Sequence, residues 1–492
     1  MRVTNLMMTN NALFNLQKQE QRLNRLDQQY TTQKKISTPS QDPIIATRAL
    51  KLNTTYSEVT QYVTKNIPDA VAWMSMTQSA LDNTSSILSS IYEKCVQGNT
   101  DGLEDVDRKA IATSLAEYRD QIYQEGTSSY SGRFLFTGFK TDTNLVFTEP
   151  SNDEYTITEN FTPEDLSSVS SVIYKVDDTA AAAGKVPVKV DFDRVRMAYD
   201  NLDSGVTPQI TVTADDGSTS TMAVTKSFAT YEAFLTDYET NGLGANDVVY
   251  IEDKGELILG EDAKQTLKAS SGFSIEYQKT GFDTNDLRPE HYFTCTRVRD
   301  KGLDTEKTFE YIAQDQEIKY LVNYNQQMTV NVQAKDCYTH DMGRDVDELV
   351  DIVNDAIAAQ DKMDALENKM KAEVEGSPQY ETYKALYENA KVEFELKSKI
   401  MQQSFADNEV RFQQYATRFS DQATDTGARE QRVELIRTRL ENQQADVEEL
   451  QSENIDVDLS EIIVRYTSAL DVYQAALSAT AKSITQTLLD YL

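Results

Sequence analysis

Apolar residues near the C-terminal end of the chain recur in alternating steps of four and three. This spacing averages 3.5 residues, which is the repeat of a helix that packs along a partner in a left-handed supercoil. A second row beside it is mostly small and would let a partner backbone come close. Residues 456–492 contain no glycine or proline, so we predict one uninterrupted helix. The first row is Leu459, Ile463, Tyr466, Leu470, Tyr473, Leu477, Thr480, Ile484, Thr487 and Tyr491, and the second is Ile462, Ala469, Ala476 and Ser483.

A weaker version of this pattern marks the N-terminal segment. Leu6 and Leu13 are seven residues apart, and Leu16, Leu23 and Tyr30 repeat that spacing. Charged residues interrupt the row, so we predict a helix over residues 5–34 with only a partial seam. Two exposed seams, one at each end of the chain, are most economically buried against each other. The alternative is a pair of ordinary amphipathic helices packed on a globular core.

A long helical stretch follows a loop that contains two prolines. Residues 36–43 form this loop, and Ser40 or Asp42 is expected to cap the next helix. That helix is predicted over residues 44–96. Pro68 should kink it or mark a restart, because proline cannot donate the helical hydrogen bond. A further helix is predicted from residue 105 to residue 124.

From Tyr130 the period of the apolar residues changes from that of a helix to that of a strand. Two hairpins are predicted, with turns at residues 215–217 and near Gly255. The strand pattern extends to Val332, and the helical pattern returns after Gly343. Breaks in this last helical region are expected at residues 376–378 and at Gly427.

The order of helices, strands and helices predicts an α+β fold. We expect a long antiparallel helical rod or coiled coil, formed by the N- and C-terminal segments, with a β-rich domain inserted between them. The N-terminal helical core segment would span residues 1–140. The inserted β-rich outer region, of one or two subdomains, would span 141–342, and the C-terminal helical core segment 343–492.

Composition narrows the possible partners. The formal net charge of −32 opposes binding to nucleic acid and to anionic lipid headgroups, so neither is expected as a partner. No stretch approaches the roughly 20 apolar residues that cross a bilayer, so no membrane insertion is expected. The first residues lack the pattern of a cleaved secretory signal. Three cysteines are too few for a disulfide framework.

No catalytic motif is present in the sequence, so the chain is not expected to be an enzyme or to need a cofactor. One candidate metal site consists of two pairs, His291 with Cys295 and Cys337 with His340. Two cysteines and two histidines are a common ligand set for zinc. The gap between the two pairs is long, and their positions in or near strands turn the side chains of each pair apart. Buried neutral cysteines and unrelated histidines are the simpler interpretation. A zinc-dependent protein remains an alternative.

Several segments at both ends resemble the bacterial flagellin family, and among its members those at the junction between hook and filament. The loop and helix start at residues 34–50 is similar to the Lys-Arg-Ile-x-x-Pro-Ser-Asp-Asp-Pro loop of that family. Gln33 stands where the family usually has glycine, and Gln41 where it usually has aspartate. The remaining matching segments are Met1–Asn5, Asn66, Asp69, Ala70, Trp73, Tyr130–Gly138, Gly427–Arg429, Ser452–Asp458, Tyr473–Leu477 and Leu488–Leu492.

The resemblance implies a structural subunit of the flagellum that reaches the cell exterior through the flagellar channel, without a cleaved signal. Implied partners are a second junction protein on the hook side, flagellin on the filament side, further copies in a ring or helical layer, and an export chaperone. Flagellin itself is the nearest alternative, although Asp42-Pro43 and the final Asp-Tyr-Leu favour a junction member. A secreted helical stalk with an adhesive head is the alternative from another class.

The function expected from this resemblance is assembly by terminal helices that fold fully only in the polymer. Single helices of about thirty residues with half-exposed apolar seams are marginal in water. Burial against each other and against neighbouring subunits would stabilise them. The predicted assembly interface consists of Leu6, Leu13, Leu16, Leu23, Tyr30, Leu459, Ile463, Tyr466, Leu470, Tyr473, Leu477, Ile484, Leu488 and Tyr491.

Overall fold

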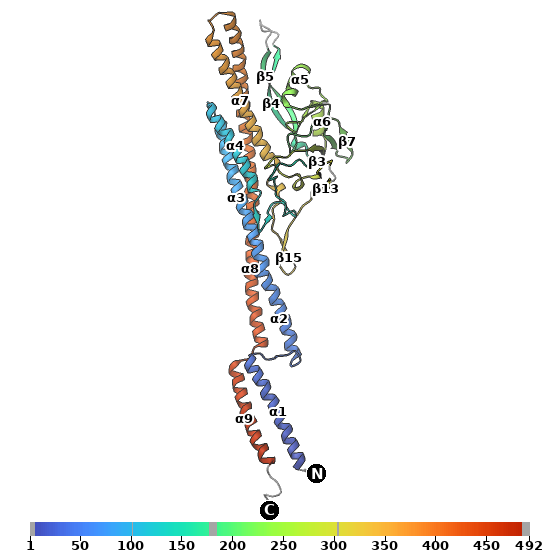
Figure 1. Ribbon diagram of the computed structural model, residues 1–492, viewed down its shortest axis with the longest axis vertical. Coiled ribbons are helices and arrows are strands. Elements are labelled where there is room, and N and C mark those ends of the chain that lie inside the picture. Colours follow the sequence, from blue (N-terminus) through green and yellow to red (C-terminus); the bar gives the residue numbers. More distant parts are fainter. Residues whose placement is uncertain (1–4, 101, 177–184, 303–304, 485–492) are drawn as a thin grey trace, which may run out of the picture. The chain divides into compact units, whose positions relative to one another are not determined.

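The computed structural model describes residues 5–100, 102–176, 185–302 and 305–484 (Figure 1). The chain forms two compact units. Unit 1 comprises residues 1–71, 320–328 and 431–492, and unit 2 comprises residues 72–319 and 329–430. Long helices at both ends and antiparallel sheets in the middle confirm the predicted α+β class. The predicted three-part division stays a prediction.

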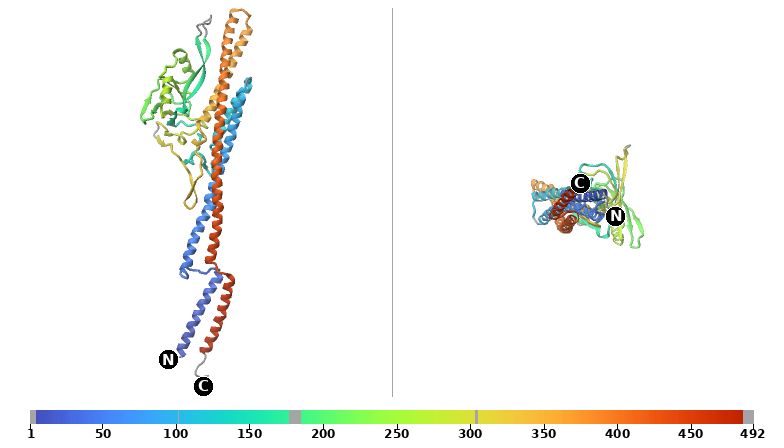
Figure 2. Two further views of the ribbon diagram at one scale, coloured as in Figure 1. Left: turned by 180° about the vertical axis from the view of Figure 1, so that it is seen from behind. Right: turned by 90° about the horizontal axis from the view of Figure 1, so that it is seen from below.

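Unit 1 consists of two helix pairs and one short hairpin. Helices α1 and α9 run antiparallel and lie side by side in both views (Figures 1 and 2). Helix α2 lies against the end of α8, where the Gln444 amide donates to the Thr60 hydroxyl and the Asn454 amide donates to the Ile45 carbonyl. The elements are α1 (Asn5–Thr32), α2 (Pro43–Gln61), the start of α3 (Ile67–Gly98), the end of α8 (Pro378–Ile455), α9 (Leu459–Ile484), β14 (Lys319–Asn323) and β15 (Gln326–Thr329).

Local chemistry explains where these helices start and bend. The Asp42 carboxylate accepts from the amides of Ile44 and Ile45 at 3.0 and 3.1 Å, with Pro43 in the first turn of α2. The predicted cap is therefore Asp42. A π-helical turn at Tyr62–Asn66 separates α2 from α3. Its position directly before Pro68 fits the predicted irregularity, because proline removes one helical donor there.

The helical part of unit 2 is built from α3, α4, α7 and α8 around large apolar side chains. Trp73, Phe405, Phe412 and Phe419 are among the side chains that are almost wholly buried. The predicted break at Gly427 is wrong, because α8 runs unbroken from Pro378 to Ile455. A single glycine costs a helix only about 1 kcal/mol, and packing against neighbouring helices overrides it. The two further helices are α4 (Asp105–Glu125) and α7 (His340–Ala372).

Helix α7 begins at His340, four residues before the predicted start, so Gly343 lies inside its first turn. A Cβ on Gly343 would meet the Tyr123 hydroxyl at 2.4 Å. The amide of Gly343 donates to that hydroxyl at 3.0 Å. Glycine therefore allows the close approach of α4 and α7. The predicted break at residues 376–378 is confirmed, since α7 ends at Ala372 and α8 begins at Pro378.

Two sheets form the inserted part of unit 2. The six-stranded sheet has the order β13-β12-β3-β11-β6-β7 and is wholly antiparallel, and the five-stranded sheet has the order β4-β5-β10-β9-β8 with one parallel pair, β8 and β9. Both predicted hairpins are confirmed, as β6–β7 and β9–β10.

Helix α5 packs on the five-stranded sheet, where Phe234 joins an apolar cluster with Phe192 and Ile258. The bounds are β1 (Ser129–Tyr130), β2 (Arg133–Phe134), β3 (Glu154–Phe161), β4 (Ser167–Val176), β5 (Lys185–Arg196), β6 (Gln209–Thr213), β7 (Thr219–Met222), β8 (Lys226–Phe228), α5 (Tyr231–Asn241), β9 (Val248–Ile251), β10 (Glu256–Leu259), α6 (Glu261–Lys268), β11 (Gly272–Lys279), β12 (Thr294–Arg299) and β13 (Lys307–Tyr311).

Candidate assembly interface

The contact between α1 and α9 is a narrow apolar strip. Leu26, Ile462 and Ala469 are its buried residues. The rings of Tyr30 and Tyr466 stack with centroids 5.8 Å apart and planes 11° apart. The predicted pairing of the two terminal helices is confirmed, and among the predicted interface residues it brings Leu23, Tyr30 and Tyr466 to this strip.

On α9 the row that faces α1 is the one that the sequence marked as secondary. Ile462 and Ala469 are buried and Ala476 is half-buried. Leu459, Ile463 and Leu477 of the first row are 45%, 44% and 42% exposed. Two overlapping heptad rows share one helix, and the row with smaller residues turns inward because it lets the two backbones approach closely. The larger side chains of the first row are left beside the contact. Of the remaining first-row residues, Tyr466, Leu470 and Tyr473 are half-buried and Thr480 is buried.

The predicted interface residues on α1 also divide into half-buried and exposed ones. Leu16 and Leu23 are half-buried, whereas Leu13 and Tyr30 are exposed by 42% and 43%. The sequence reasoning missed Leu26, although it follows Leu23 at helical spacing. The side chains of Leu6 and Ile484 and the whole of Leu488 and Tyr491 lie outside the described residues.

Further apolar side chains are exposed on both helices away from the strip. Met7, Met8 and Phe14 project from α1, and Val464 and Val472 project from α9. Scattered apolar residues are normal on a surface, but this many on one helix pair is typical of an interaction surface. The pair therefore carries a thin inner contact and a broad apolar exterior.

Two segments that resemble the flagellin family meet where the two helix pairs of unit 1 join. The Lys35 amide donates to the Ile455 carbonyl at 2.6 Å, and the Val457 amide donates to the Gln33 carbonyl at 3.0 Å. The Lys34 ammonium forms an ion pair with Asp456. The hydrogen bond from Lys34, together with one from Ser452, lowers the pKa of the Asp456 carboxyl.

Both departures from the family pattern lie at this joint. Gln33 has a φ of +58°, the left-handed conformation that follows many helices and favours glycine. The chain therefore keeps the backbone shape that the usual glycine would give, with a side chain that strains it. The Gln41 side-chain oxygen accepts from the Ser37 amide at 2.8 Å, so a neutral amide closes the loop where a carboxylate is usual.

The structure gives the zinc alternative no support. The His291 ring nitrogen lies 3.0 Å from the Asn144 carbonyl oxygen, and that of His340 lies 2.8 Å from the Tyr199 hydroxyl. Burial lowers the pKa of His291 to about 4 and that of His340 to about 3, and it raises the pKa of Cys295 to about 12. Within the described ranges, no three histidine, cysteine or acidic residues gather as metal ligands would.

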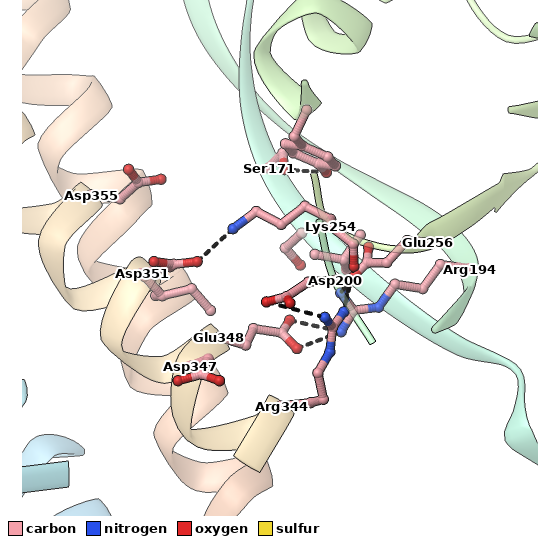
Figure 3. A pocket seen from close by; sticks show the side chains of 14 residues that line it. Ser171, Arg194, Asp200, Lys254, Glu256, Arg344, Asp347, Glu348, Asp351 and Asp355 are labelled. Carbon is pink, nitrogen blue, oxygen red and sulfur yellow. Dashed lines mark hydrogen bonds and ion pairs between the residues drawn. The ribbon is translucent and has the colours of Figure 1, made fainter. Parts of the chain in front are cut away.

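One small cavity, of about 140 Å³, lies within unit 2 between the five-stranded sheet and α7 (Figure 3). Charged side chains line it, and they are paired with one another: Arg194 with Glu348, Arg344 with Asp200, and Lys254 with Asp351. This pairing is typical of a structural contact.

Among the helices that the structure describes, none combines the length and the apolar character needed to span a bilayer.

Comparisons with known proteins match the two ends of the chain. The bacterial flagellin N-terminal helical region matches residues 3–141, and the bacterial flagellin C-terminal helical region matches residues 412–492. Flagellar hook-associated protein 3 of Salmonella typhimurium strain LT2 is 26% identical over 237 residues, which cover 42% of this chain and 74% of that protein.

A second curated relative and a solved structure are also similar to this chain. Flagellar hook-associated protein 3 of Escherichia coli K12 is 32% identical over 117 residues, which cover 24% of this chain and only 37% of that protein. The crystal structure of FlgL from Xanthomonas campestris is 11% identical, with a TM-score of 0.32 over 82% of this chain and 99% of the other. The two helical ends of the chain are therefore similar to those of bacterial flagellins, and its curated relatives are flagellar hook-associated proteins.

Proposed function

We propose that the chain forms the junction between the hook and the filament of the bacterial flagellum. Its curated relatives, which are flagellar hook-associated proteins, support a structural role in the flagellar axis. The proposed junction role rests on the apolar exterior of α1 and α9, which a lone subunit leaves in water. A protein that works singly would gain nothing from such a surface, whereas a subunit in a closed ring or helical layer buries it against neighbours.

The stabilisation available from this burial is moderate for each side chain. Leu459, Ile463 and Leu477 would each bury a few tens of Å² in a polymer. At ~25 cal/mol per Å² this gives about 1 kcal/mol for each side chain. Ordering of the helices offsets part of the gain. Net binding therefore depends on many residues of one subunit and on many subunits closing together.

Assembly-coupled folding follows from the thin inner contact. Leu26, Ile462 and Ala469 are the fully buried residues of the strip, and most of the stability of a helix in a protein comes from such packing rather than from its own propensity. We expect α1 and α9 to pair in the free chain but to open often. Hydrogen exchange of their amides should slow at least tenfold when the chain enters flagella. Equal exchange in the free and the assembled protein would contradict this mechanism.

The partners on the two sides follow from a junction role. We propose a second junction protein towards the hook, flagellin towards the filament, and other copies of this chain within the layer. An export chaperone would cover the C-terminal helix before delivery through the flagellar channel to the cell exterior, without a cleaved signal. Cells that lack the protein should bear hooks without filaments and release flagellin into the medium. Filaments of normal length on such cells would overturn the junction role and leave flagellin-like filament packing as the alternative.

The apolar exterior can be tested in the full chain by charge substitution. Ile463→Asp with Leu477→Asp changes two exposed side chains beside the inner contact, so the stability of the free chain should change little. Incorporation into flagella should fall more than tenfold, because each buried carboxylate lacks a partner. The matched control is Ser468→Asp with Ala479→Asp, two exposed small residues on another face of the same helix. Equal incorporation of both double variants would refute this surface as the interface.

A further inference from the structure

A buried ionic network joins the five-stranded sheet to two long helices within unit 2. Its centre is a pair of arginines on β5, Arg194 and Arg196, of which Arg194 is only 4% exposed. Within the sheet, Arg194 donates to the Glu256 carboxylate of the neighbouring strand at 2.8 Å. The sheet itself thus supplies one carboxylate for two guanidinium groups.

The other carboxylates come from α7 (Figure 3). One nitrogen of Arg194 donates to both oxygens of Glu348 at 2.7 Å, and Arg196 donates to the same carboxylate at 3.0 Å. Burial alone would raise the pKa of Glu348, but the two arginines lower it to about 2. Asp345, one helical turn earlier, is wholly buried and accepts from Arg196.

Helix α8 completes the network. Asp345 accepts from Arg411 and from the Tyr415 hydroxyl, each at 2.9 Å. Asp345 therefore has donors from β5 and from α8 at once. The network closes only when β5, α7 and α8 are all in place.

The sequence separations within the network are large. Arg196 and Asp345 are 149 residues apart, and Arg194 and Glu348 are 154 residues apart. Burying a charge without its partner is strongly unfavourable, more so than breaking an exposed pair. If the sheet closed before α7 arrived, the two arginines on β5 would share Glu256 alone. Both arginines can therefore be buried only once α7 supplies Glu348 and Asp345, because a buried cation without a counter-charge is strongly disfavoured.

The geometry points to a folding order in which the five-stranded sheet completes its packing only on an already formed α7–α8 pair. The inserted region is then not an independent domain on a stalk, because its stability depends on helices from the C-terminal part of the chain. This inference does not rest on the role at the junction and applies to the free chain. It predicts that the sheet and the two helices unfold together.

Refolding of the full chain tests the order directly. The chain is diluted from urea and pulse-labelled by hydrogen exchange. We expect the amides of α7 to gain protection before those of β5 and β10, or together with them. Protection of β5 and β10 while α7 still exchanges freely would overturn the proposal.

Equilibrium exchange of variants tests the network itself. In Asp345→Asn with Glu348→Gln, we expect protection of the β5 amides to fall at least tenfold more than protection of the α3 amides. The matched control is Asp361→Asn with Asp364→Asn, which removes two exposed charges from the same helix. Equal protection of β5 in the two double variants would overturn the coupling.

A milder substitution keeps the test possible if the double variant Asp345→Asn with Glu348→Gln does not fold. Tyr415→Phe removes one hydrogen bond to Asp345 and keeps every charge. We expect a several-fold loss of β5 protection, because the lost hydrogen bond from α8 helps to hold Asp345 against Arg196 of β5. Unchanged β5 protection in Tyr415→Phe would count against transmission through Asp345.

Discussion

The two units of the chain differ in both charge and surface. Unit 1 has 14 Lys and Arg against 16 Asp and Glu, whereas unit 2 has 34 against 64. Among the described large apolar side chains that are exposed, 16 lie in unit 1 and 12 in unit 2, although unit 1 has less than a third of the residues. Nearly neutral, apolar surfaces associate, and strongly acidic surfaces repel one another. The chain thus separates a part suited to polymer contacts from a part suited to solvent.

The interiors of the two units also differ, because unit 2 has a more extensive buried core than the pair of terminal helices in unit 1. Unit 2 has aromatic clusters in its sheets and its helices, and a charged network between them. The described contact of the terminal helices in unit 1 rests on the narrow strip around Ile462. We therefore expect substitutions inside unit 2 to change the stability of the free chain. Those on the exterior of unit 1 should change assembly instead.

The largest expected effect is on the helical core of unit 2. Phe412 on α8 is wholly buried, so Phe412→Ala should lower the free energy of unfolding by about 3–5 kcal/mol. The single tryptophan, Trp73, is buried in the same unit and reports urea unfolding by fluorescence. Val410→Ala, two residues away at a 55% exposed position, should change this free energy by less than about 0.5 kcal/mol. Equal effects of the two substitutions would remove the contrast between core and surface.

A smaller effect is expected inside the helix pair of unit 1. Ile462 is 2% exposed, and Ile462→Ala should destabilise the pairing of α1 with α9 by about 2 kcal/mol. The measurement is hydrogen exchange of the α1 amides, because the lost contact lies on the partner helix. Val464→Ala, at a 65% exposed position on the same helix, is the control. If Ile462→Ala also shifted the urea midpoint of Trp73, the two units would not be separable in stability.

The sequence was sufficient to predict most helices and hairpins and the pairing of the two terminal helices. Helical spacing located α1 and α9, and turn residues located both predicted hairpins. It could not decide which of two overlapping heptad rows on α9 faces inward, because that depends on how closely the backbone of α1 approaches Ala469. Nor could it bring Arg196 to Asp345, since sequence spacing carries no information on partners 149 residues apart. The continuity of α8 through Gly427 was missed for the same reason, as tertiary packing decides it.

Between pH 5 and pH 8, a pH-dependent change in stability is expected in unit 2. The Glu159 carboxylate accepts from the Ala198 amide at 3.0 Å and from the Tyr277 hydroxyl at 3.1 Å. Burial outweighs these bonds and raises its pKa from 4.5 to about 8. A raised pKa in the folded state gives stability that is fully present below pH 4.5 and is lost as the pH rises towards 8. The loss is at most about 1.4 kcal/mol per pH unit.

Glu159→Gln isolates this contribution, because every other titration is common to both proteins. The free energy of unfolding of the variant, relative to that of the natural chain, should rise between pH 5 and pH 8. Urea unfolding at pH 5, 6.5 and 8 measures the difference. A difference that stays constant with pH would show that Glu159 keeps its ordinary pKa in the folded chain.

The smallest expected effect is at the joint of unit 1, where Gln33 adopts a φ of +58° with an exposed side chain. The left-handed conformation costs a residue with a Cβ about 1–2 kcal/mol. Gln33→Gly removes that cost but gives the unfolded chain more freedom, so the net gain should be about 0.5 kcal/mol. Gln33→Ala keeps the strain and should give no gain, which separates backbone strain from loss of the side chain. The gain should appear as slower hydrogen exchange at the Val457 amide, which donates to the Gln33 carbonyl. Faster exchange there in both Gln33→Gly and Gln33→Ala than in the natural chain would mean that the glutamine side chain, and not the backbone shape, holds the joint.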